Sequence, residues 1–394
     1  MRILIMAAAA ATYDHQGYFT ELAKHKDVEL KVLISPYWSS FAAGGISLKK
    51  ENRVYANRFG YNNESGYNLI EKVPLFCGKS YHIFTGLWKL LNEINPDVIE
   101  YIFEPWNISL TQIILWKKLF RKKTKIVFFS HENIYQTYQN RFFYNLIQYK
   151  IIEKYNLKRV DGCNGATNEI LEVMKKKGFS GKTIVTGDEL DSKIFHEKDA
   201  SVLKKKLKIK NFVIGYAGRL EEAKGVMTLI DAIGQIKNEN FTLLICGWSD
   251  SDFTKKILEK IKIFGIENKV IIINERLGRK IVDYYNIMDV IVVPSLTTKY
   301  WKEQFGRVNI EAMACGTPVI GSSSGGIPEV IGNAGLIFKE GEANSLKDKI
   351  LTIMKDKKLL KELSIKSIER VKDNFTGKKK AEKSYKFYKK LLNQ

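Results

Sequence analysis

The sequence predicts an α/β protein made of two successive β/α domains, with a ligand cleft between them. The chain has 394 residues and is 45% hydrophobic, which suits two domains and excludes a disordered chain. Apolar runs alternate with helical patterns in the first half, and the same alternation restarts after residue 200. Strands separated by helices imply right-handed crossovers and parallel sheets.

The first half contains four apolar runs of strand length, bounded by turn or helix signals. These predicted strands are residues 2–6, 27–35, 96–103 and 125–130. Pro96 opens the third run, a position that proline tolerates in a strand. Residues 81–94 have the apolar periodicity of a helix.

The second half repeats this organisation. Its predicted strands are residues 211–218, 241–247, 269–274, 289–295, 317–322 and 335–338, and its predicted helices are residues 224–237, 252–264 and 278–287. We therefore place domains at 1–190 and 191–375, followed by a terminal helix at 376–394. Parallel β/α domains bind ligands at the carboxyl ends of their strands, so the site is expected in the cleft between the domains.

The chain is strongly basic, with 64 Lys and Arg against 43 Asp and Glu and a net charge of +21. Residues 343–394 carry about half of this excess, and a second basic cluster spans residues 116–125 beside Trp116, Leu119 and Phe120. Only 11 of the 64 basic residues are Arg, and no nucleic-acid-binding motif is present, which disfavours a nucleic-acid partner. Two interpretations stay open, solvated lysine-rich faces and attraction to an anionic membrane.

The last predicted helix has two distinct faces. One face carries Ala381, Tyr385, Tyr388 and Leu392, and a face about 200° away carries Lys379, Lys383, Lys386 and Lys390. This pattern is typical of a docked helix with a solvated back. The alternative is a helix that presents lysines to an anionic membrane surface.

The cysteines and the amino terminus suggest a cytoplasmic protein. The four cysteines are widely spaced, without C-x-x-C, so neither a disulfide framework nor a zinc site is expected. No apolar run reaches the length of a membrane span, and residues 1–15 are too weakly basic for a signal peptide. We expect a cytoplasmic location, with peripheral contact to the inner face of the cell membrane through the lysine face as an option.

A turn rich in glycine and cations follows the predicted strand 211–218. It reads GYAGRLEEAKG at 215–225 and would direct backbone N–H groups toward an anion. Arg219 and Lys224 add a planar fork and a point charge, a pair that suits a diphosphate and would stabilise negative charge on it as a leaving group. Ordinary surface cations after a strand are the alternative.

The stretch 302–332 carries two carboxylates eight positions apart, Glu303 and Glu311. A helix is expected to start near Phe305 and Gly306, with Glu303 in the loop before it and Glu311 about one and a half turns inside. Carboxylates accept hydrogen bonds from vicinal sugar hydroxyls, and the helix amino terminus between them suits phosphate. The alternative is a pair of glutamates on a helix surface.

His131 follows the predicted strand 125–130, at the strand end where reactive groups collect. It could hydrogen-bond a sugar or share charge in a transition state, although a single histidine is also common in purely structural roles.

The D-x-D pair Asp250 and Asp252 fits a helix-capping loop better than a metal site. Five alanines, Ala7 to Ala11, stand where a dinucleotide-binding G-x-G-x-x-G would be, which disfavours a nicotinamide cofactor.

Several of these motifs together resemble a known family. GRLEEAKG, the E-x(7)-E segment EQFGRVNIE and EAMACGTPVIGSSSGGIPEVI resemble the retaining nucleotide-sugar glycosyltransferases of family four, which have two Rossmann-like domains in the GT-B architecture. The similarity is dense over 211–340. TGDELDSKIF resembles the segment after that family's interdomain linker, with Asp191 and Phe195 matching. The final helix resembles a terminal helix that returns to the first domain.

The resemblance implies roles for the residues at the matching positions. Arg219 and Lys224 would contact the donor diphosphate, Glu303 the donor sugar and Glu311 the ribose. The remaining matches are Phe305 and Gly306, as backbone contacts near phosphate and sugar; Leu277, beside the base; and His131, near the donor sugar. The family uses no metal, retains the anomeric configuration and needs no cofactor. The loop Ala7–Ala11 departs from the family's glycine-rich loop, and the first domain resembles the family only weakly.

The resemblance thus implies a retaining, metal-independent transfer of a hexose-type sugar from a nucleotide-diphosphate donor, with a UDP-sugar expected first. A glycan or lipid-linked acceptor in cell-surface polysaccharide, glycolipid or glycoprotein glycan assembly is expected, bound by the first domain. Two other classes stay open. One is a GT-B nucleotide-sugar epimerase or hydrolase, which would form product without an acceptor. The other is a non-catalytic protein that binds glycans or nucleic acid.

Overall fold

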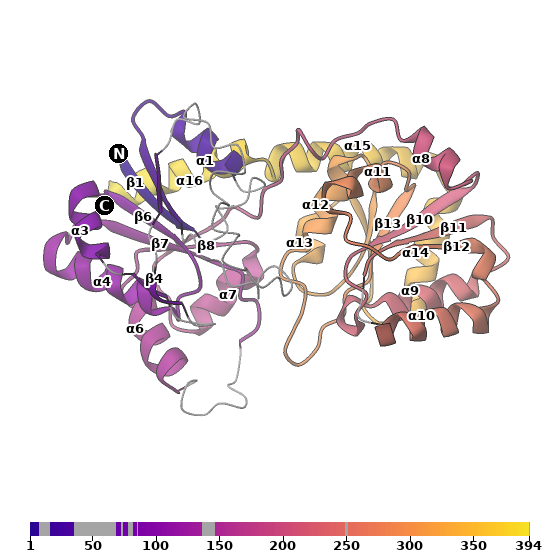
Figure 1. The fold of residues 1–394 in the computed structure, drawn as a ribbon, viewed down its shortest axis with the longest axis horizontal. Coiled ribbons are helices and arrows are strands. Elements are labelled where there is room, and N and C mark those ends of the chain that lie inside the picture. Colours follow the sequence, from indigo (N-terminus) through magenta and orange to yellow (C-terminus); the bar gives the residue numbers. More distant parts are fainter. Residues whose placement is uncertain are drawn as a thin grey trace. The chain divides into compact units, whose positions relative to one another are not determined.

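A computed structural model of the chain shows two compact units (Figure 1). The structure describes residues 1–7, 16–34, 68–71, 74–77, 82–84, 86–135, 146–248 and 251–393. Unit 1 comprises Met1–Glu189 together with Thr376–Gln394, and unit 2 comprises Leu190–Phe375. Each unit contains a parallel sheet between layers of helices, so the predicted α/β class with two Rossmann-like domains is confirmed.

Unit 1 contains a seven-stranded parallel sheet in the order β3-β2-β1-β6-β7-β8-β9. The strands are β1 (Arg2–Ala7), β2 (Glu29–Ile34), β3 (Asn68–Glu71), β6 (Val98–Ile102), β7 (Lys125–Ser130), β8 (Gly162–Gly165) and β9 (Lys182–Val185). A separate antiparallel pair is formed by β4 (Pro74–Cys77) and β5 (His82–Phe84). The four strands expected from apolar runs are all present.

Helices cover both faces of this sheet. They are α1 (Gln16–Ala23), α3 (Leu87–Ile94), α4 (Ile108–Phe120), a π-helix η5 (Leu146–Glu153), α6 (Lys154–Leu157), α7 (Asn168–Lys176) and α16 (Gly377–Leu392). The sheet has one hydrophobic core on each face. Alternate residues of β1 contribute to one core or the other, because successive side chains of a strand point to opposite faces. Leu4 and Met6 pack with α3 and α4, whereas Ile3 and Ile5 pack with α1 and α16.

One helix prediction in unit 1 is partly wrong. Residues 81–94 were expected to form a single helix, but His82–Phe84 form β5 and the helix α3 begins only at Leu87. Gly86, which precedes α3, has a φ of +65°, a left-handed conformation that glycine adopts readily. The backbone therefore changes direction at Gly86, and the apolar residues before it pair with β4.

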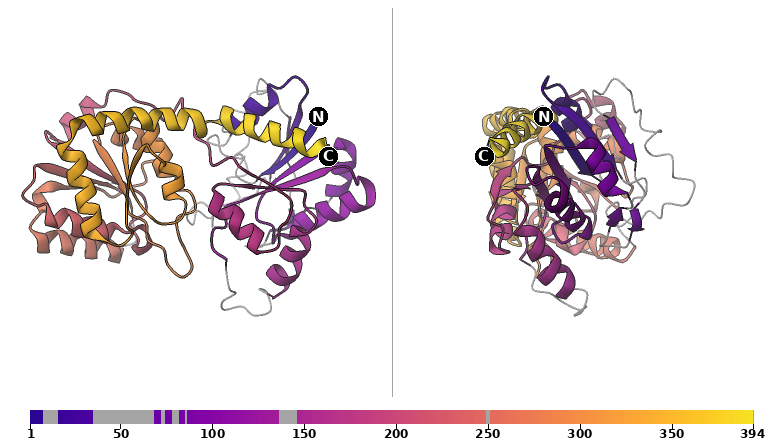
Figure 2. Two further views of the ribbon diagram at one scale, coloured as in Figure 1. Left: turned by 180° about the vertical axis from the view of Figure 1, so that it is seen from behind. Right: turned by 90° about the vertical axis from the view of Figure 1, so that its left-hand side faces the viewer.

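The helix α16 packs against α1 in unit 1 (Figure 2), as expected for a helix that returns to the first domain. Ala381 and Tyr388 of the predicted apolar face are buried, whereas Tyr385 and Leu392 lie at its edge. The buried face is centred on other residues, namely Lys380, Ser384, Phe387 and Leu391. The predicted face is therefore displaced by about one residue, and it omitted a buried lysine.

A buried polar cluster joins α16 to the middle of the sheet. The Tyr18 hydroxyl donates to the Glu100 carboxylate at 2.7 Å and lies 2.9 Å from the Tyr388 hydroxyl. The Lys380 ammonium lies 5.2 Å from the centre of the Tyr18 ring. Burial raises the pKa of Glu100 above its ordinary value, although the Tyr18 hydrogen bond and the Lys380 charge oppose this rise.

Unit 2 contains a six-stranded parallel sheet in the order β12-β11-β10-β13-β14-β15. The strands are β10 (Phe212–Ala217), β11 (Phe241–Cys246), β12 (Val270–Ile273), β13 (Val290–Val293), β14 (Val319–Ser322) and β15 (Gly335–Phe338). All six correspond to the runs expected from the sequence. This strand order reverses direction between β10 and β13, and ligands of doubly wound sheets bind at such a point.

The helical elements of unit 2 surround this sheet (Figure 1). They are α8 (Ser201–Lys206), η6 (Glu222–Lys224), α9 (Val226–Gln235), α10 (Ser251–Phe264), η7 (Glu267–Lys269), η8 (Gly278–Lys280), α11 (Ile281–Tyr285), α12 (Arg307–Ala314), α13 (Ile327–Ile331), α14 (Ala343–Lys355) and α15 (Lys357–Asn374). Two predicted helices are interrupted at their start: residues 222–224 and 278–280 form 3₁₀ turns before α9 and α11.

Over the described ranges, no helix combines the length and the apolar composition that a membrane crossing requires.

Candidate functional site

The candidate site in unit 2 lies at the carboxyl ends of β10 and β13. The strand order reverses between these two neighbours, which leaves room for a ligand above the sheet edge. The chain leaves β10 into the turn 218–225, and it leaves β13 into the loop 294–306. These two segments carry most of the site residues predicted from the sequence.

The backbone of the turn 218–225 is largely occupied by internal hydrogen bonds. The amides of Gly218 and Leu220 donate to the carbonyls of Cys246 and Trp248, each at 3.0 Å. The amides of Lys224 and Gly225 close the 3₁₀ turn. The expected cradle of free N–H groups is therefore not found at these four positions, and the turn contributes cationic side chains instead.

Gly225 allows this turn to lie directly against the end of β13. Its φ is +69°, and a Cβ atom added there would overlap the main-chain oxygen of Pro294. The Leu296 amide donates to the Ala223 carbonyl at 2.8 Å, which fixes the two segments to each other. Only glycine combines this conformation with such a close approach of two backbones.

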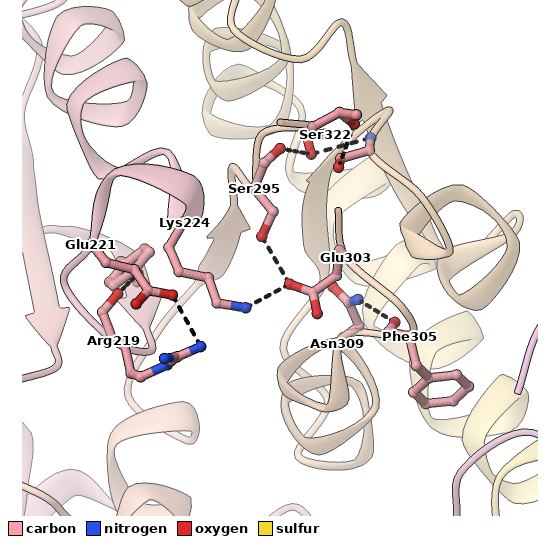
Figure 3. A network of polar contacts seen from close by, with 11 residues as sticks. Arg219, Glu221, Lys224, Ser295, Glu303, Phe305, Asn309 and Ser322 are labelled. Carbon is pink, nitrogen blue, oxygen red and sulfur yellow. Dashed lines mark hydrogen bonds and ion pairs between the residues drawn. The ribbon is translucent and has the colours of Figure 1, made fainter. Parts of the chain in front are cut away.

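This contact brings Lys224 and Glu303 together from positions 79 residues apart in the sequence (Figure 3). The Lys224 Nζ lies 2.8 Å from Glu303 Oε2, and the Ser295 hydroxyl donates to the same oxygen at 2.9 Å. The Ser322 hydroxyl in turn donates to the Ser295 carbonyl at 2.6 Å. The Glu303 carboxylate is thus held in a fixed orientation by a lysine and a serine.

The ammonium of Lys224 also contacts an aromatic ring. It lies 4.5 Å from the centre of the Trp301 ring, a distance at which the ring face attracts a cation. Trp301 is held by its own loop, since its amide donates to the Thr298 hydroxyl at 2.9 Å and its carbonyl accepts from the Thr298 amide at 2.7 Å. An ammonium has three N–H donors, so Lys224 can hold Glu303 and bind a further acceptor.

Arg219 lies in the same turn but has a different partner. Its guanidinium is 3.0 Å from the Glu221 carboxylate, and about half of its side chain is exposed. Figure 3 shows the Arg219–Glu221 pair beside the Lys224–Glu303 pair rather than joined to it. The structure therefore places two cations on one turn, with Lys224 more buried than Arg219.

Phe305 and Gly306 form the junction between the loop and α12. The Phe305 ring is buried and packs edge-on against Phe375, with ring centres 5.5 Å apart, so only its backbone is available to a ligand. Gly306 precedes α12 with a φ of +76°. Asn309 donates to the Phe305 carbonyl at 3.4 Å, and α12 begins where the sequence predicts.

Glu311 lies inside α12 with partners of its own. The Tyr285 hydroxyl donates to Glu311 Oε2 at 3.0 Å, and the Arg307 guanidinium is 3.7 Å from Oε1. Glu311 is thus contacted by Tyr285 and Arg307, whereas Glu303 is contacted by Lys224 and Ser295. Leu277 is half-buried and precedes the 3₁₀ turn η8, in the connection from β12 to α11.

His131 lies in unit 1, directly after β7. Its Nε2 is 3.0 Å from the Asp188 carboxylate, and its amide donates to Glu104 at 2.8 Å. Withdrawal from water lowers the pKa of the imidazole, but the Asp188 and Glu104 carboxylates outweigh this and leave the pKa above its ordinary value. The imidazole is thus oriented and favoured in its charged form.

Replacing Asp188 by Asn should lower the pKa of His131, because the main carboxylate that stabilises the imidazolium is removed. The chain contains five histidines, so the His131 resonance can be followed by NMR across a pH titration. The raised pKa also means that the ion pair stabilises the fold fully below about pH 6.5 and loses this effect as the pH rises through the folded-state value. Asp191→Asn is the control, and equal His131 midpoints in both variants would contradict the interpretation.

The structure adds residues that the sequence analysis missed. Ser295, Trp301 and Asp188 contact Glu303, Lys224 and His131, respectively. Ser295 lies two residues beyond the end of β13, close to the kind of strand end that singled out His131, so similar reasoning could have found it. Trp301 lacks any comparable spacing signal in the sequence.

The D-x-D pair lies only partly within the described residues, since Asp250 is outside them. Asp252 lies in the first turn of α10, 3.4 Å from Lys255. In the part of the chain that the structure describes, no group of three or more His, Cys, Asp or Glu side chains could hold a metal ion. Ala8–Ala11 also lie outside the described residues.

Residues 198–370 match the family model of glycosyl transferases group 1. Among similar curated proteins, N-acetyl-alpha-D-glucosaminyl L-malate synthase of Bacillus anthracis is 27% identical over 194 residues, which are 48% of this chain and 49% of that protein. The capsular polysaccharide biosynthesis glycosyltransferase CapM of Staphylococcus aureus is 32% identical over 171 residues, which are 42% of this chain and 43% of that protein. The matches thus span about half the length of these relatives or less.

Solved structures resemble the chain over nearly its whole length. A glycosyltransferase from Rickettsia africae has a TM-score of 0.71 and 17% identity, and covers 100% of this chain and 99% of its own. The Anabaena protein HepE in complex with UDP has a TM-score of 0.71 and 18% identity, and covers 99% of this chain and 100% of its own. At such low identity this similarity concerns the fold.

The match to the family model falls in unit 2, which holds the Lys224–Glu303 pair, and the fold similarity extends over both units. Residues 198–370 therefore match the glycosyl transferases group 1 family, within a chain that has the two Rossmann-like domains of the GT-B fold.

Proposed function

We propose that the protein is a retaining, metal-independent glycosyltransferase that moves a hexose-type sugar from a nucleotide-diphosphate donor to a glycan or glycolipid acceptor. The observation that carries this proposal is the contact of Lys224 with Glu303 and Ser295 at the point where the strand order reverses. It places a cation that suits a phosphate beside a fixed carboxylate that suits sugar hydroxyls. The family match over the same residues supports the same chemistry.

In the proposed reaction, the bond between the sugar C1 and the diphosphate oxygen breaks, and a bond from an acceptor hydroxyl to C1 forms on the same face. The electron pair of the broken bond stays on the diphosphate, and the proton of the acceptor hydroxyl passes to that leaving group. The positive charges of Lys224 and Arg219 would stabilise the departing diphosphate. Glu303 would hold the sugar hydroxyls, so it is not the acid or nucleophile of a hydrolase.

Other residues would position the donor. Glu311 would hold the ribose, Leu277 would lie beside the base, and the backbone of Phe305 and Gly306 would contact phosphate and sugar. His131, oriented by Asp188 and with its pKa raised by that carboxylate, would act near the donor sugar. We assign acceptor binding to unit 1 and donor binding to unit 2, with residues 376–394 completing unit 1.

We propose a UDP-sugar as the first donor to test, because solved structures of Anabaena HepE hold UDP and UDP-glucose. The acceptor class rests on CapM, whose name assigns it to capsular polysaccharide synthesis. Other matched relatives are named for malate and inositol 3-phosphate, which makes small hydroxylated acids and polyols the next acceptors to test.

A thermal-shift screen against UDP-, GDP- and other nucleotide sugars tests the donor, and transfer assays with the stabilising donor test the reaction. We expect one donor to raise Tm, transfer that is unchanged in EDTA, and an NMR-detected product with the anomeric configuration of the donor. Product without an acceptor would instead indicate an epimerase or hydrolase. A chain that binds no nucleotide but binds glycan or DNA would indicate a non-catalytic binding protein.

Contact with an anionic membrane surface through α16 also stays a prediction. Lys386 and Lys390 are exposed, while Lys379 and Lys383 are half-buried, and Lys379 lies 3.8 Å from Glu382. If this face binds membranes, replacing the four lysines by Gln should weaken binding to anionic vesicles. A second surface of unit 1 competes for this role.

A further inference from the structure

The end of helix α4 exposes large apolar side chains. Leu115, Leu119 and Phe120 are 38%, 62% and 50% exposed, and they lie within six residues of one another. Single exposed apolar residues are ordinary on protein surfaces, but a group that gathers at one place marks an interaction site. The fully buried Trp116 lies between them in sequence and anchors α4, through a 2.9 Å hydrogen bond from its indole to Asn92.

The same segment is surrounded by positive charge. Lys118, Arg121, Lys122 and Lys123 are all exposed, and none of these four is in an ion pair among the described residues. Residues 105–131 contain no Asp or Glu. Cations in the last turn of a helix interact favourably with the helix dipole, which explains the presence of Lys117 and Lys118. The dipole explains neither Lys122 and Lys123, which lie beyond the helix, nor the exposed apolar residues.

The neighbouring helix α6 extends this surface. The Thr111 hydroxyl of α4 donates to the Asn156 side chain of α6 at 2.9 Å, which places the two helices side by side. Lys154 of α6 and Lys158 directly after it are exposed, and Ile151 of the preceding π-helix η5 is 58% exposed. Positive charge and an exposed apolar side chain therefore also occur on the segment 151–158 beside α4.

We propose that this surface, the α4 patch (Leu115, Lys118, Leu119, Phe120, Arg121, Lys122 and Lys123), docks unit 1 onto an anionic membrane surface. The cations would contact lipid phosphates, while Leu119 and Phe120 enter the boundary between headgroups and acyl chains. An anionic polymer would use the charges without needing the apolar residues, and a neutral protein partner would use the apolar residues without needing the charges. A membrane of anionic lipid uses both.

The α4 patch and the lysines of α16 cannot both rest on one flat membrane. The helix α4 packs on the core that includes Leu4 and Met6 of β1, and α16 packs on the opposite core that includes Ile3 and Ile5. Figure 1 shows the two helices on opposite sides of the first sheet. The α4 patch combines exposed apolar residues with cations that form no ion pair within the described ranges, whereas the predicted α16 face carries only lysines. These observations favour the α4 patch over the lysines of α16 as the surface that contacts the membrane.

The test is sedimentation of the full chain with vesicles of phosphatidylcholine, with and without 30% phosphatidylglycerol, at low and high salt. Each interfacial cation contributes roughly fivefold, so removing four as K118Q/R121Q/K122Q/K123Q should weaken binding to the anionic vesicles by at least about 30-fold, the effect of two of them, and by up to about 600-fold. The matched control, K379Q/K383Q/K386Q/K390Q, removes the same charge from α16 and should change binding less than about threefold.

A second variant, L119S/F120S, tests the apolar contact at constant charge. It should weaken binding about tenfold or more at low salt. Its Tm should stay close to that of the native chain, because Leu119 is mostly exposed and Phe120 loses one edge-on contact, with Trp88. The proposal is overturned if the native chain does not bind the anionic vesicles, if both charge variants lose binding equally, or if L119S/F120S binds like the native chain. Tighter binding to heparin or DNA than to vesicles, unaffected by L119S/F120S, would overturn it in favour of an anionic polymer. None of these outcomes depends on donor binding in unit 2.

Discussion

Replacing Lys224 by Met should lower kcat/KM for the nucleotide-sugar donor by about 100- to 1,000-fold, the usual cost of removing a group that stabilises developing negative charge. Lys224 is the more buried cation of its turn, and it lies 2.8 Å from Glu303. The substitution removes the charge that we propose beside the leaving diphosphate, and it also removes a group that holds the Glu303 carboxylate. We therefore expect a loss in kcat together with a rise in KM.

Lys260→Met is the matched control for this prediction. Lys260 lies in the same unit, is buried to a similar extent, and forms a 2.6 Å ion pair with Asp231, outside the candidate site. Steady-state kinetics of both variants with the same donor give the comparison, and thermal melts show whether each is folded. A folded Lys224→Met enzyme with native kcat/KM, or equal losses in both variants, would remove Lys224 from the proposed mechanism.

Replacing Gly225 by Ala should lower the free energy of unfolding of unit 2 by about 2–4 kcal/mol, from a left-handed conformation and a forced separation of two packed segments. The added Cβ would overlap the Pro294 carbonyl, which is backbone and cannot rotate away. The turn that carries Lys224 would have to move off β13. Donor turnover should fall with stability, because Lys224 and Glu303 are brought together by this contact.

Gly265→Ala separates the cost of the left-handed backbone conformation from the cost of the steric overlap with Pro294. Gly265 has a φ of +65°, close to that of Gly225, but an added Cβ would meet no atom within 4 Å. This control should therefore cost only about 1 kcal/mol, the penalty of the left-handed conformation itself. Chemical denaturation of both variants measures the difference. Equal losses would mean that the close approach to Pro294 contributes nothing.

The strands that the sequence predicts best are those buried on both faces by helices. β1 and β7 are long apolar runs because each touches two cores, and β10 and β11 are buried along nearly their whole length. Such runs are visible without any tertiary information. β8, with the sequence Gly-Cys-Asn-Gly, has no such run. A Cβ at Gly162 would press against the Phe387 ring of α16 and against Val127, so β8 contains small residues because of a helix more than 200 residues away in the sequence.

The candidate site likewise contains some residues that local sequence predicts and others that depend on distant contacts. Lys224, Glu303 and His131 could be proposed one by one, because each follows a strand in a motif with its own chemistry. Their partners Ser295, Trp301 and Asp188 depend on how loops are placed in space, which spacing along the chain does not encode. Lys380 is the clearest case, because its burial depends on the Glu100 carboxylate and the Tyr18 ring, neither of which the helical pattern of α16 reveals.

The buried cluster of Tyr18, Glu100, Lys380 and Tyr388 has a consequence for the order in which the chain folds. The ribosome synthesises residues 376–394 only after all of unit 2, yet they cover one face of the sheet in unit 1. During synthesis this face, with the Glu100 carboxylate on it, therefore lacks its α16 cover until unit 2 has been made. Unit 2 can fold as one continuous stretch of chain, whereas unit 1 must wait for a segment that arrives late.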